Sequence, residues 1–525
     1  MTAAARAVEL ELFTHRFEML AARMGEMLRR TALSVNVKER LDFSCALLDG
    51  EGRLVVNAPH IPVHLGALGL CVRAVAARLD PGPGDVAVTN DPACGGSHLP
   101  DVTVITPVFL AADDPAPLGW VASRAHHAEI GGTHPGSMPP AATTLAEEGV
   151  VLPPRYLVRG GAGRWEEARE WLSAGPFPSR AVDENLADLQ AAVAANHQGV
   201  RALRELAAEH GARRVARYMR LLRQAAAGRL RRALAGLGDG SFAAVETLDD
   251  GTPLAVAIAL AGGGARIDFT GSGGVHPGNL NATPAIVTSV VMYVLRLLLA
   301  EPLPLNEGLM EPVELVLPPG LLNPPFAADP RESPAVVGGN VETSQRLVDT
   351  LLKALGLVAC SQGTMNNTLF GNERFGYYET VGGGAGAGAG FDGAPAVHTH
   401  MTNTAITDPE VLELRCPVRL ERFEIRCGSG GAGTRRGGDG ARREIVFLEP
   451  MYLSVLGQHR RSGPYGMAGG SAGAPARQFL VRADGTREPL ASVDGREVFP
   501  GDRLVLETPG GGGWGPAGGD GGAAP

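Results

Sequence analysis

The sequence is poor in lysine and aromatic residues, and its cysteines are scattered. Lys38 and Lys353 are the only lysines, and aromatic residues make up 5% of the 525 positions. The six cysteines contain no C-x-x-C pair. That spacing excludes a zinc knuckle built on thiolates and argues against a disulfide scaffold, so we expect reduced, mostly buried thiols.

Blocks of one charge and long apolar runs are also missing. The formal net charge is -9, with arginines and acids interspersed, and this leaves no basic surface for nucleic acid. The first 30 residues place acids and arginines inside their apolar pattern, which excludes a signal peptide and a membrane span there. We therefore predict a cytoplasmic protein with no nucleic-acid or membrane partner.

Phosphate-binding motifs are absent as well. The sequence has no G-x-x-x-x-G-K-[ST] loop and no G-x-S-x-G nucleophile elbow. Residues 428–433 match G-x-G-x-x-G, but a predicted strand follows them, so no helix N-terminus is present to hold a phosphate. We predict that this chain binds no ATP by itself.

Helical and strand patterns predict a mixed α/β, or α+β, fold. Residues 6–32 carry apolar positions at helical spacing, and residues 182–236 form an Ala/Leu/Arg-rich stretch broken near Gly211. Residues 41–127 alternate short apolar runs with turn signals, beginning with a hairpin around Asp49 to Gly52. The predicted organisation is an N-terminal metal-site α/β domain (1–180), a helical arm (181–240), a central α/β domain (241–410), a C-terminal region of antiparallel strands (411–510) and a flexible glycine-rich tail (511–525).

Histidines are concentrated in one part of the chain. Six of the 13 fall within 75 residues: His60, His64, His98, His126, His127 and His134. His98 lies in a glycine/proline loop, Asp101 begins the strand DVTVITPVF, and the strand LGWVASRA ends at His126 and His127. Two imidazoles and one carboxylate from adjacent strand ends would make an open three-ligand site for zinc, manganese or iron.

The pair His126 and His127 cannot both face that site if the strand persists, because neighbouring side chains point to opposite faces. We favour His126 as the metal ligand and His127 as an acid/base group facing the substrate. Asp42, His60 and His64 are near enough in sequence to join as supporting groups or as a fourth ligand. The alternative is that these histidines are ordinary loop and core residues.

Polar loops elsewhere offer weaker candidates. His398 and His400 lie on one face of an extended stretch, where a second metal site or plain packing is possible. Asn340 and Asn366 lie in loops of small polar residues, which form substrate pockets and buried turns alike. We select these two asparagines, with His60 and His64, as candidate substrate-binding residues.

Several blocks resemble the hydantoinase B/oxoprolinase family, which includes subunits of ATP-dependent hydantoinases and 5-oxoprolinases and the α subunits of acetone carboxylases. The blocks run from about residue 8 to Trp514 and include TNDPACGGSHLPDVTVITPVF, SRAHHAEIGGTHPGSMPP, GGNVETSQRLVDTLL, SQGTMNNTLFGN and YYETVGGGAGA. The resemblance implies metal ligands at His98, Asp101 and one histidine of the His126–His127 pair.

The resemblance also implies a division of labour. A hydantoinase A-like partner would bind ATP and phosphorylate the carbonyl oxygen of a small cyclic amide, and this chain would complete the hydrolysis with a divalent metal. Asp42 or His127 would move protons. We expect a hetero-oligomer containing two copies of this chain, and 5-oxoproline is the first substrate to test.

Three other functions are considered. The chain could resemble an acetone carboxylase α subunit, which a third, small subunit would reveal. It could be a non-catalytic assembly subunit, in which case purified protein would hold well below one equivalent of metal. It could also be a metallohydrolase that acts without ATP or a partner, which an assay of the chain alone would show.

Overall fold

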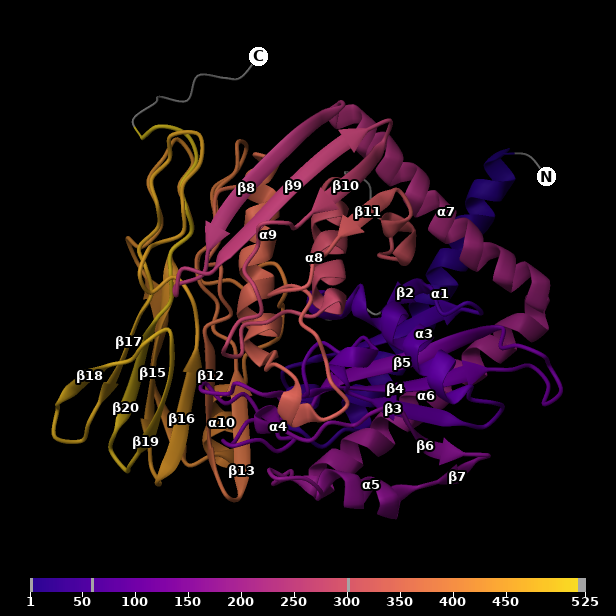
Figure 1. Ribbon diagram of the computed structural model, residues 1–525, viewed down its shortest axis with the longest axis horizontal. Helices are drawn as coiled ribbons and strands as arrows, with labels where there is room; N and C mark the ends of the chain where they lie inside the picture. Colours follow the sequence, from indigo (N-terminus) through magenta and orange to yellow (C-terminus); the bar gives the residue numbers. More distant parts are fainter. Residues whose placement is uncertain (1–2, 58–60, 300–302, 518–525) are drawn as a thin grey trace.

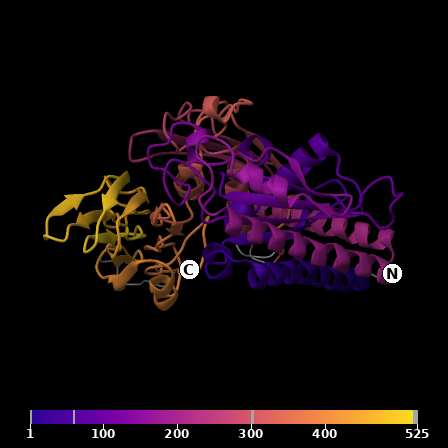
Figure 2. The same ribbon diagram turned by 90° about the horizontal axis from the view of Figure 1, so that it is seen from below.

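Figure 1 shows the computed structural model, which describes residues 3–57, 61–299 and 303–517. Its strands form four sheets with helices packed between and around them. The mixed α/β class predicted from the sequence is confirmed. Seen from below, the C-terminal strands occupy one end of the molecule and the long N-terminal helices the other (Figure 2).

The first sheet is antiparallel throughout, in the order β2-β1-β5-β4-β3-β6-β7. Its strands are β1 Phe43–Asp49, β2 Leu54–Asn57, β3 Val86–Thr89, β4 Asp101–Val108, β5 Gly119–His126, β6 Arg155–Arg159 and β7 Ala162–Gly163. The predicted hairpin at Asp49 to Gly52 is the turn between β1 and β2. Central strands β4 and β5 are buried along their whole length, because helices cover both faces of the sheet.

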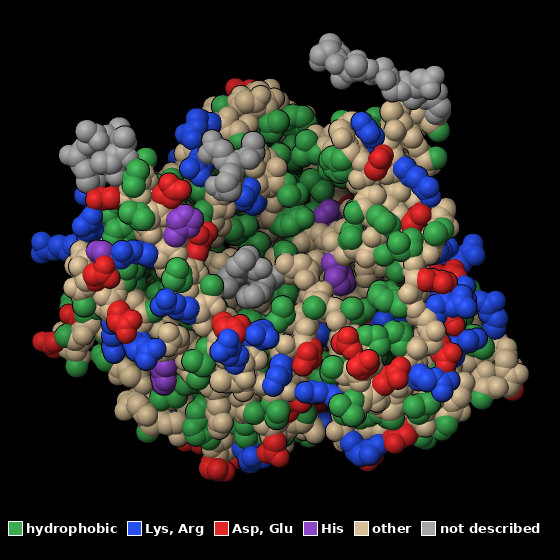
Figure 3. Space-filling model, turned by 180° about the vertical axis from the view of Figure 1, so that it is seen from behind, with side chains coloured by type: hydrophobic (Ala, Val, Ile, Leu, Met, Phe, Trp, Pro, Cys, Tyr) green, Lys and Arg blue, Asp and Glu red, His purple; other side chains and the backbone are tan. Residues whose placement is uncertain are grey.

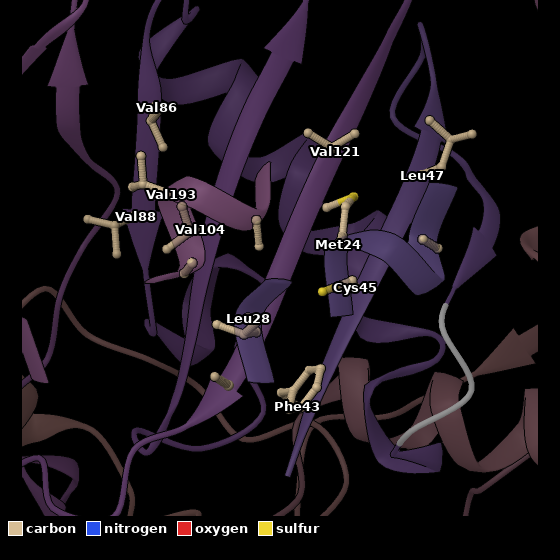
Figure 4. Packing of buried hydrophobic residues seen from close by; sticks show 14 of the residues in the cluster. Met24, Leu28, Phe43, Cys45, Leu47, Val86, Val88, Val104, Val121 and Val193 are labelled. Atoms are coloured by element: carbon tan, nitrogen blue, oxygen red, sulfur yellow. The ribbon is translucent and has the colours of Figure 1, made fainter. Parts of the chain in front are cut away.

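Long helices pack on one face of this sheet and a shorter helix on the other. Helices α1 (Ala3–Thr31) and α6 (Val182–His210) contact β1, β4 and β5, while α3 (Ala67–Leu79) covers the opposite face. Figure 4 shows Met24 and Leu28 of α1 and Val193 of α6 against strand residues such as Val104 and Val121. This core fixes the strand ends that carry the candidate site.

The predicted helical arm is a pair of helices packed on the body. Helix α7 (Ala212–Leu237) follows α6 after Gly211, whose φ of 82° ends the first helix. Helix α6 contributes to the core of the first sheet, and the C-terminal half of α7 contributes to the core of the second. The arm therefore joins two parts of the molecule.

The second sheet has the order β11-β10-β9-β8, with only the β10–β11 pair parallel. Its strands are β8 Gly240–Thr247, β9 Pro253–Ala261, β10 Gly264–Asp268 and β11 Val313–Val316. Helices α8 (Pro284–Leu297) and α9 (Ser344–Ala354) pack with α7 against it. A π-helical turn, η5 (Gly339–Thr343), leads directly into α9.

The third and fourth sheets are antiparallel and share one core. The third has the order β13-β12-β16-β19 and the fourth β14-β15-β20-β17-β18. Their strands are β12 Asn367–Asn372, β13 Phe375–Glu379, β14 Val418–Arg426, β15 Gly440–Phe447, β16 Met451–Leu456, β17 Arg477–Val481, β18 Arg487–Pro489, β19 Val493–Val498 and β20 Arg503–Glu507. The predicted C-terminal hairpins are present.

Short helices complete the chain. They are α2 Val35–Lys38, α4 Leu145–Glu148, α5 Trp165–Leu172, α10 Pro409–Arg415, η1 Pro62–His64, η2 Pro92–Cys94, η3 Glu307–Met310 and η4 Pro330–Glu332. Among the described residues, one helical stretch, Pro62–Leu79, is long and apolar enough to cross a membrane, and 56% of it is buried inside the fold.

Glycine-rich segments from four parts of the chain hydrogen-bond to one another beside the fourth sheet. The amide of Gly511 donates to the carbonyl of Gly438 at 2.8 Å, and a Cβ at Gly511 would lie 1.9 Å from the carbonyl oxygen of Ala385. Residues 511–515, predicted as the start of a flexible tail, are therefore packed in this layer because only glycine allows backbones to approach so closely. Residues 518–525 lie outside the described part.

Candidate metal centre

The candidate ligands meet because three strands end together. Asp101, the first residue of β4, pairs directly with His126, the last residue of β5. Phe43 of β1 pairs with Ala125, so Asp42 lies beside His126, whose amide donates to the Asp42 carbonyl at 3.0 Å. Residues paired across neighbouring strands present their side chains on the same face. The sheet thus aligns these side chains without help from the rest of the chain.

His98 joins them from the loop before β4. Its Nε2 lies 3.2 Å from Asp101 Oδ1, and His126 Nδ1 lies 3.5 Å from the same oxygen. All three side chains are buried, and one ligand atom from each lies within 4.8 Å of the others. Ligands about 2.1 Å from a tetrahedral cation are roughly 3.4 Å apart. The spacing and donor types therefore fit a divalent metal.

The charges of the three groups also fit a cation. Burial alone would raise the pKa of Asp101, but the nearby His98 and His64 hold it well below its usual value. Burial lowers the pKa of His126, with the Asp101 hydrogen bond opposing that effect. An ionised carboxylate and a neutral imidazole are the forms in which these side chains bind metals.

His64 and Ser97 hold the carboxylate of Asp101 from the other side. His64 Nε2 lies 3.3 Å from Asp101 Oδ2, and its Nδ1 is 3.0 Å from the hydroxyl of Ser44. The Ser97 hydroxyl donates a hydrogen bond to the same Oδ2. These contacts leave Oδ1 directed at His98 and His126, which suits an oriented ligand.

Asp42 stands at the edge of the centre. Its Oδ2 lies 4.0 Å from His126 Nδ1 and 4.0 Å from Nη1 of Arg40. Arg40 has no exposed surface and donates to the carbonyl of Tyr378 at 2.8 Å and to the Thr404 hydroxyl at 3.1 Å. A buried guanidinium thus balances the second carboxylate.

His127 lies on the other face of the sheet. Its Nδ1 is 3.0 Å from the side-chain amide of Asn185 on α6, and its ring is buried. Burial lowers its pKa. His126 and His127 therefore point to opposite faces of the sheet, as expected, and His127 faces helix α6.

The predicted substrate-binding residues fall in different places. Asn340, in the π-helical turn η5, has its Nδ2 3.2 Å from His98 Nε2, whereas Asn366 hydrogen-bonds to Gln362, Val381 and Arg460. His60 lies outside the described residues. π-Helical turns often occur at functional sites, and here the turn brings the side chain of Asn340 to His98.

Tyr378 contacts the centre and was not selected from the sequence. Its ring stacks on His126 with centroids 4.8 Å apart and an 18° tilt between the ring planes. Tyr378 belongs to β13, so the centre lies where the first and third sheets meet. The only signal in the sequence was its place in the block YYETVGGGAGA, which identifies the family and assigns no role.

The second histidine pair does not converge on one point. His400 Nε2 is 3.0 Å from Asp349 Oδ1, while His398 Nε2 is 3.5 Å from the Thr380 hydroxyl. Among the described residues, His98, Asp101 and His126 are the only group of three side chains with the spacing of metal ligands.

A cavity of about 1050 Å³ opens near the centre. Pro62 and Leu65 line it, and His64 between them in the chain contacts Asp101. Met19 of α1 and Leu305 lie on other walls. Figure 3 shows a hollow on the rear face with hydrophobic side chains at its floor. The segment from Ile61 to Leu65 thus lines this cavity and also contacts Asp101 through His64.

Comparisons with known proteins identify close relatives of the whole fold. The sequence profile of the hydantoinase B/oxoprolinase family matches residues 6–517. The chain is 43% identical to 5-oxoprolinase 1 of Arabidopsis thaliana over 97% of its own length and 42% of that protein. It therefore spans less than half of such relatives.

Two solved structures share the fold. The ATP-dependent caprolactamase from Pseudomonas jessenii matches with a TM-score of 0.87 and 27% identity, covering 97% of this chain and 91% of that chain. A nucleotide-free acetone carboxylase structure matches with a TM-score of 0.85 and 18% identity, covering 97% and 76%. At that lower identity the second likeness supports the fold alone.

Proposed function

Because the chain belongs to the hydantoinase B/oxoprolinase family, we propose that it is the metal-dependent hydrolytic part of an ATP-dependent enzyme acting on cyclic amides. The convergence of His98, Asp101 and His126 at the strand ends carries this proposal. The similarity to a 5-oxoprolinase and a caprolactamase supports the substrate class, since both names denote enzymes that act on lactam rings.

The proposed reaction begins on a partner. A hydantoinase A-like subunit binds ATP and phosphorylates the carbonyl oxygen of the ring, which makes the carbonyl carbon electrophilic. Water then adds to that carbon, the ring C–N bond breaks as the nitrogen gains a proton, and the resulting acyl phosphate is hydrolysed. Absence of a phosphate loop in this sequence supports the assignment of ATP to the partner. We also infer an assembly with two copies of this chain, located in the cytoplasm.

A divalent ion, Zn²⁺, Mn²⁺ or Fe²⁺, would be held by His98, Asp101 and His126, and it would supply Lewis acidity that lowers the pKa of the attacking water. Asp42 lies close enough to take the proton of the attacking water or to serve as a fourth ligand. His64 and Ser97 keep the Asp101 carboxylate turned toward His98 and His126. Asn340 has an unpaired, buried side-chain oxygen beside His98 that can accept a hydrogen bond from substrate.

An ATP-consumption screen tests this proposal. The chain is co-expressed with a hydantoinase A-like subunit and assayed with 5-oxoproline, hydantoin and caprolactam, with acetone plus bicarbonate as a contrasting reaction. We expect ATP consumption coupled to ring opening of a cyclic amide, with 5-oxoproline first. Activity only with acetone and bicarbonate would show that the enzyme is a carboxylase and would refute the proposed hydrolase. Ring opening without ATP or without the partner would refute the proposed division of labour.

A further inference from the structure

Tyr378 makes the only stacked ring contact on His126 among the described residues. The two ring centroids are 4.8 Å apart, and the planes differ by 18°. A second ring, that of His98, meets His126 at a steep angle of 61° with centroids 5.0 Å apart. The imidazole of His126 thus contacts the face of the Tyr378 ring and, at a steep angle, the ring of His98.

His126 lacks the usual hydrogen bond on its outer nitrogen. A metal-binding histidine generally donates its second N–H to a carboxylate, a carbonyl or water, and this bond fixes the orientation of the ring. Within the described structure, Nε2 of His126 is buried and has no hydrogen-bond partner. Apart from the contact of Nδ1 with Asp101, its orientation therefore depends on contacts with the faces of the ring, where Tyr378 stacks.

Tyr378 is itself held at both ends. Its hydroxyl donates to Asn367 Oδ1 at 2.9 Å, and the amide of Asn367 donates to Glu342 at 2.6 Å and to the carbonyl of Leu456 at 2.9 Å. Arg40 lies 4.6 Å from the centroid of the tyrosine ring and donates to its carbonyl. A ring fixed in this way offers a rigid surface.

We propose that Tyr378 is a positioning residue that sets the orientation of His126 and so links the third sheet to the metal centre on the first. The inference rests on the proposed function, because it applies only if His126 is a ligand. The effect of Tyr378 is expressed through the geometry and affinity of the bound cation.

The neighbouring Tyr377 provides a matched control. It is also buried, with 3% of its surface exposed, and it lies on the other side of β13. Its ring stacks on Phe370 at 4.8 Å, and its hydroxyl donates to Glu379 at 3.1 Å. Replacing either tyrosine by leucine removes a similar amount of core packing, but only Tyr378→Leu removes the contact with His126.

The experiment measures the dissociation constant and the visible absorption bands of Co²⁺ in the full chain, together with the Tm of each variant. We expect Tyr378→Leu to weaken Co²⁺ binding by about 10- to 100-fold, the range for losing a group that orients a ligand, and to alter the absorption bands. Tyr377→Leu should lower the Tm while leaving both Co²⁺ readouts as in the unmodified protein.

Each outcome decides a different point. If the unmodified chain binds no Co²⁺, the proposed function fails and this inference with it. If it binds Co²⁺ and Tyr378→Leu binds equally well with the same spectrum, or Tyr377→Leu loses as much affinity, only the role of Tyr378 is overturned. Should Tyr378→Leu not fold, Tyr378→Phe should weaken Co²⁺ binding by up to about fivefold through the lost hydrogen bond to Asn367, and Tyr377→Phe should not. Equal behaviour of these two variants would overturn the proposal.

Discussion

Asp42 and His127 are both buried next to His126, yet they lie on opposite faces of the first sheet. Asp42 Oδ2 is 4.0 Å from His126 Nδ1, whereas His127 contacts Asn185 on α6. Both residues were candidates for proton transfer on the basis of the sequence. Their placement now favours Asp42, because only its side chain shares the face of Asp101.

A comparison of two variants tests that assignment. We expect Asp42→Asn to reduce ATP-dependent ring opening by about 10²- to 10⁴-fold, the usual loss for a general acid or base. His127→Gln should retain a hydrogen bond to Asn185, so its rate of ring opening should fall by less than about tenfold. Turnover and bound metal are measured together for each. Normal turnover in Asp42→Asn, or a larger loss in His127→Gln, would contradict the assignment.

Metal content distinguishes the two roles left open for Asp42. If it only accepts a proton, Asp42→Asn keeps its metal. If it is a fourth ligand, the variant loses metal as well as activity. The distance of 4.0 Å to His126 Nδ1 is compatible with both.

At the scale of single elements, helix α4 carries a buried acid whose ionisation opposes folding. Glu148 accepts hydrogen bonds from the amides of Val336 and Val337, and burial raises its pKa to about 8. Burial alone would raise the pKa of its partly exposed neighbour Glu147, but the hydrogen bonds from Thr143 and Thr144 together hold that pKa below its usual value.

Glu148 makes stability depend on pH. Below about pH 4.5 the acid is protonated in both folded and unfolded chains, so the native protein bears no penalty. As the pH rises toward 8, the unfolded chain loses this proton first, and the free energy of unfolding falls by up to about 1.4 kcal/mol per pH unit. We expect Glu148→Gln to be progressively more stable than the unmodified protein between pH 5 and 8, as measured by urea unfolding.

Glu147→Gln is the control for that measurement. A lowered pKa stabilises the folded chain above the usual pKa, and that contribution is lost only as the pH falls through the folded value. Its difference from the unmodified protein should therefore change far less between pH 5 and 8 than that of Glu148→Gln, with only a small rise because the charge of Glu147 contributes to the raised pKa of Glu148. A flat difference for Glu148→Gln as well would show that Glu148 ionises freely in the folded protein.

The close packing of the glycine-rich layer can be tested by substituting single glycines. A Cβ at Gly511 would lie 1.9 Å from the carbonyl oxygen of Ala385, whereas a Cβ at Gly390 would meet nothing within 4 Å. We expect Gly511→Ala to lower the free energy of unfolding by at least 1–3 kcal/mol, as overpacking does. Gly390→Ala should change it by less than about 0.5 kcal/mol. Equal stability of the two variants in urea unfolding would contradict the packed arrangement.

At the scale of the whole molecule, local patterns predicted more of the fold than of the site. The alternation in residues 41–127 predicted strands in the part of the first sheet that holds β1 to β5, and the break at Gly211 predicted two long helices, because hydrophobic periodicity and turn residues act over short distances. Residues 511–515 were predicted to be flexible because glycine density signals flexibility, and their partners, which include Cys360 and Ser471, lie far away in the sequence.

The same distinction applies to the metal centre. Asp101 and His126 could be paired from sequence because adjacent antiparallel strands bring them together. Tyr378 could not, since it reaches His126 from a different sheet 252 positions further along the chain. Asn340 was selected only as one polar loop residue among several, and its contact with His98 depends on how the π-helical turn packs against the first sheet.

Metal analysis of the purified chain and its Asp101→Asn variant tests the central claim most directly. The substitution keeps the size of the side chain but removes the charge that His98 and His126 share. We predict about one equivalent of Zn, Mn or Fe per unmodified chain and well below one equivalent in the variant, with both proteins folded. Equal metal content in the two proteins, or none in the unmodified chain, would contradict the account.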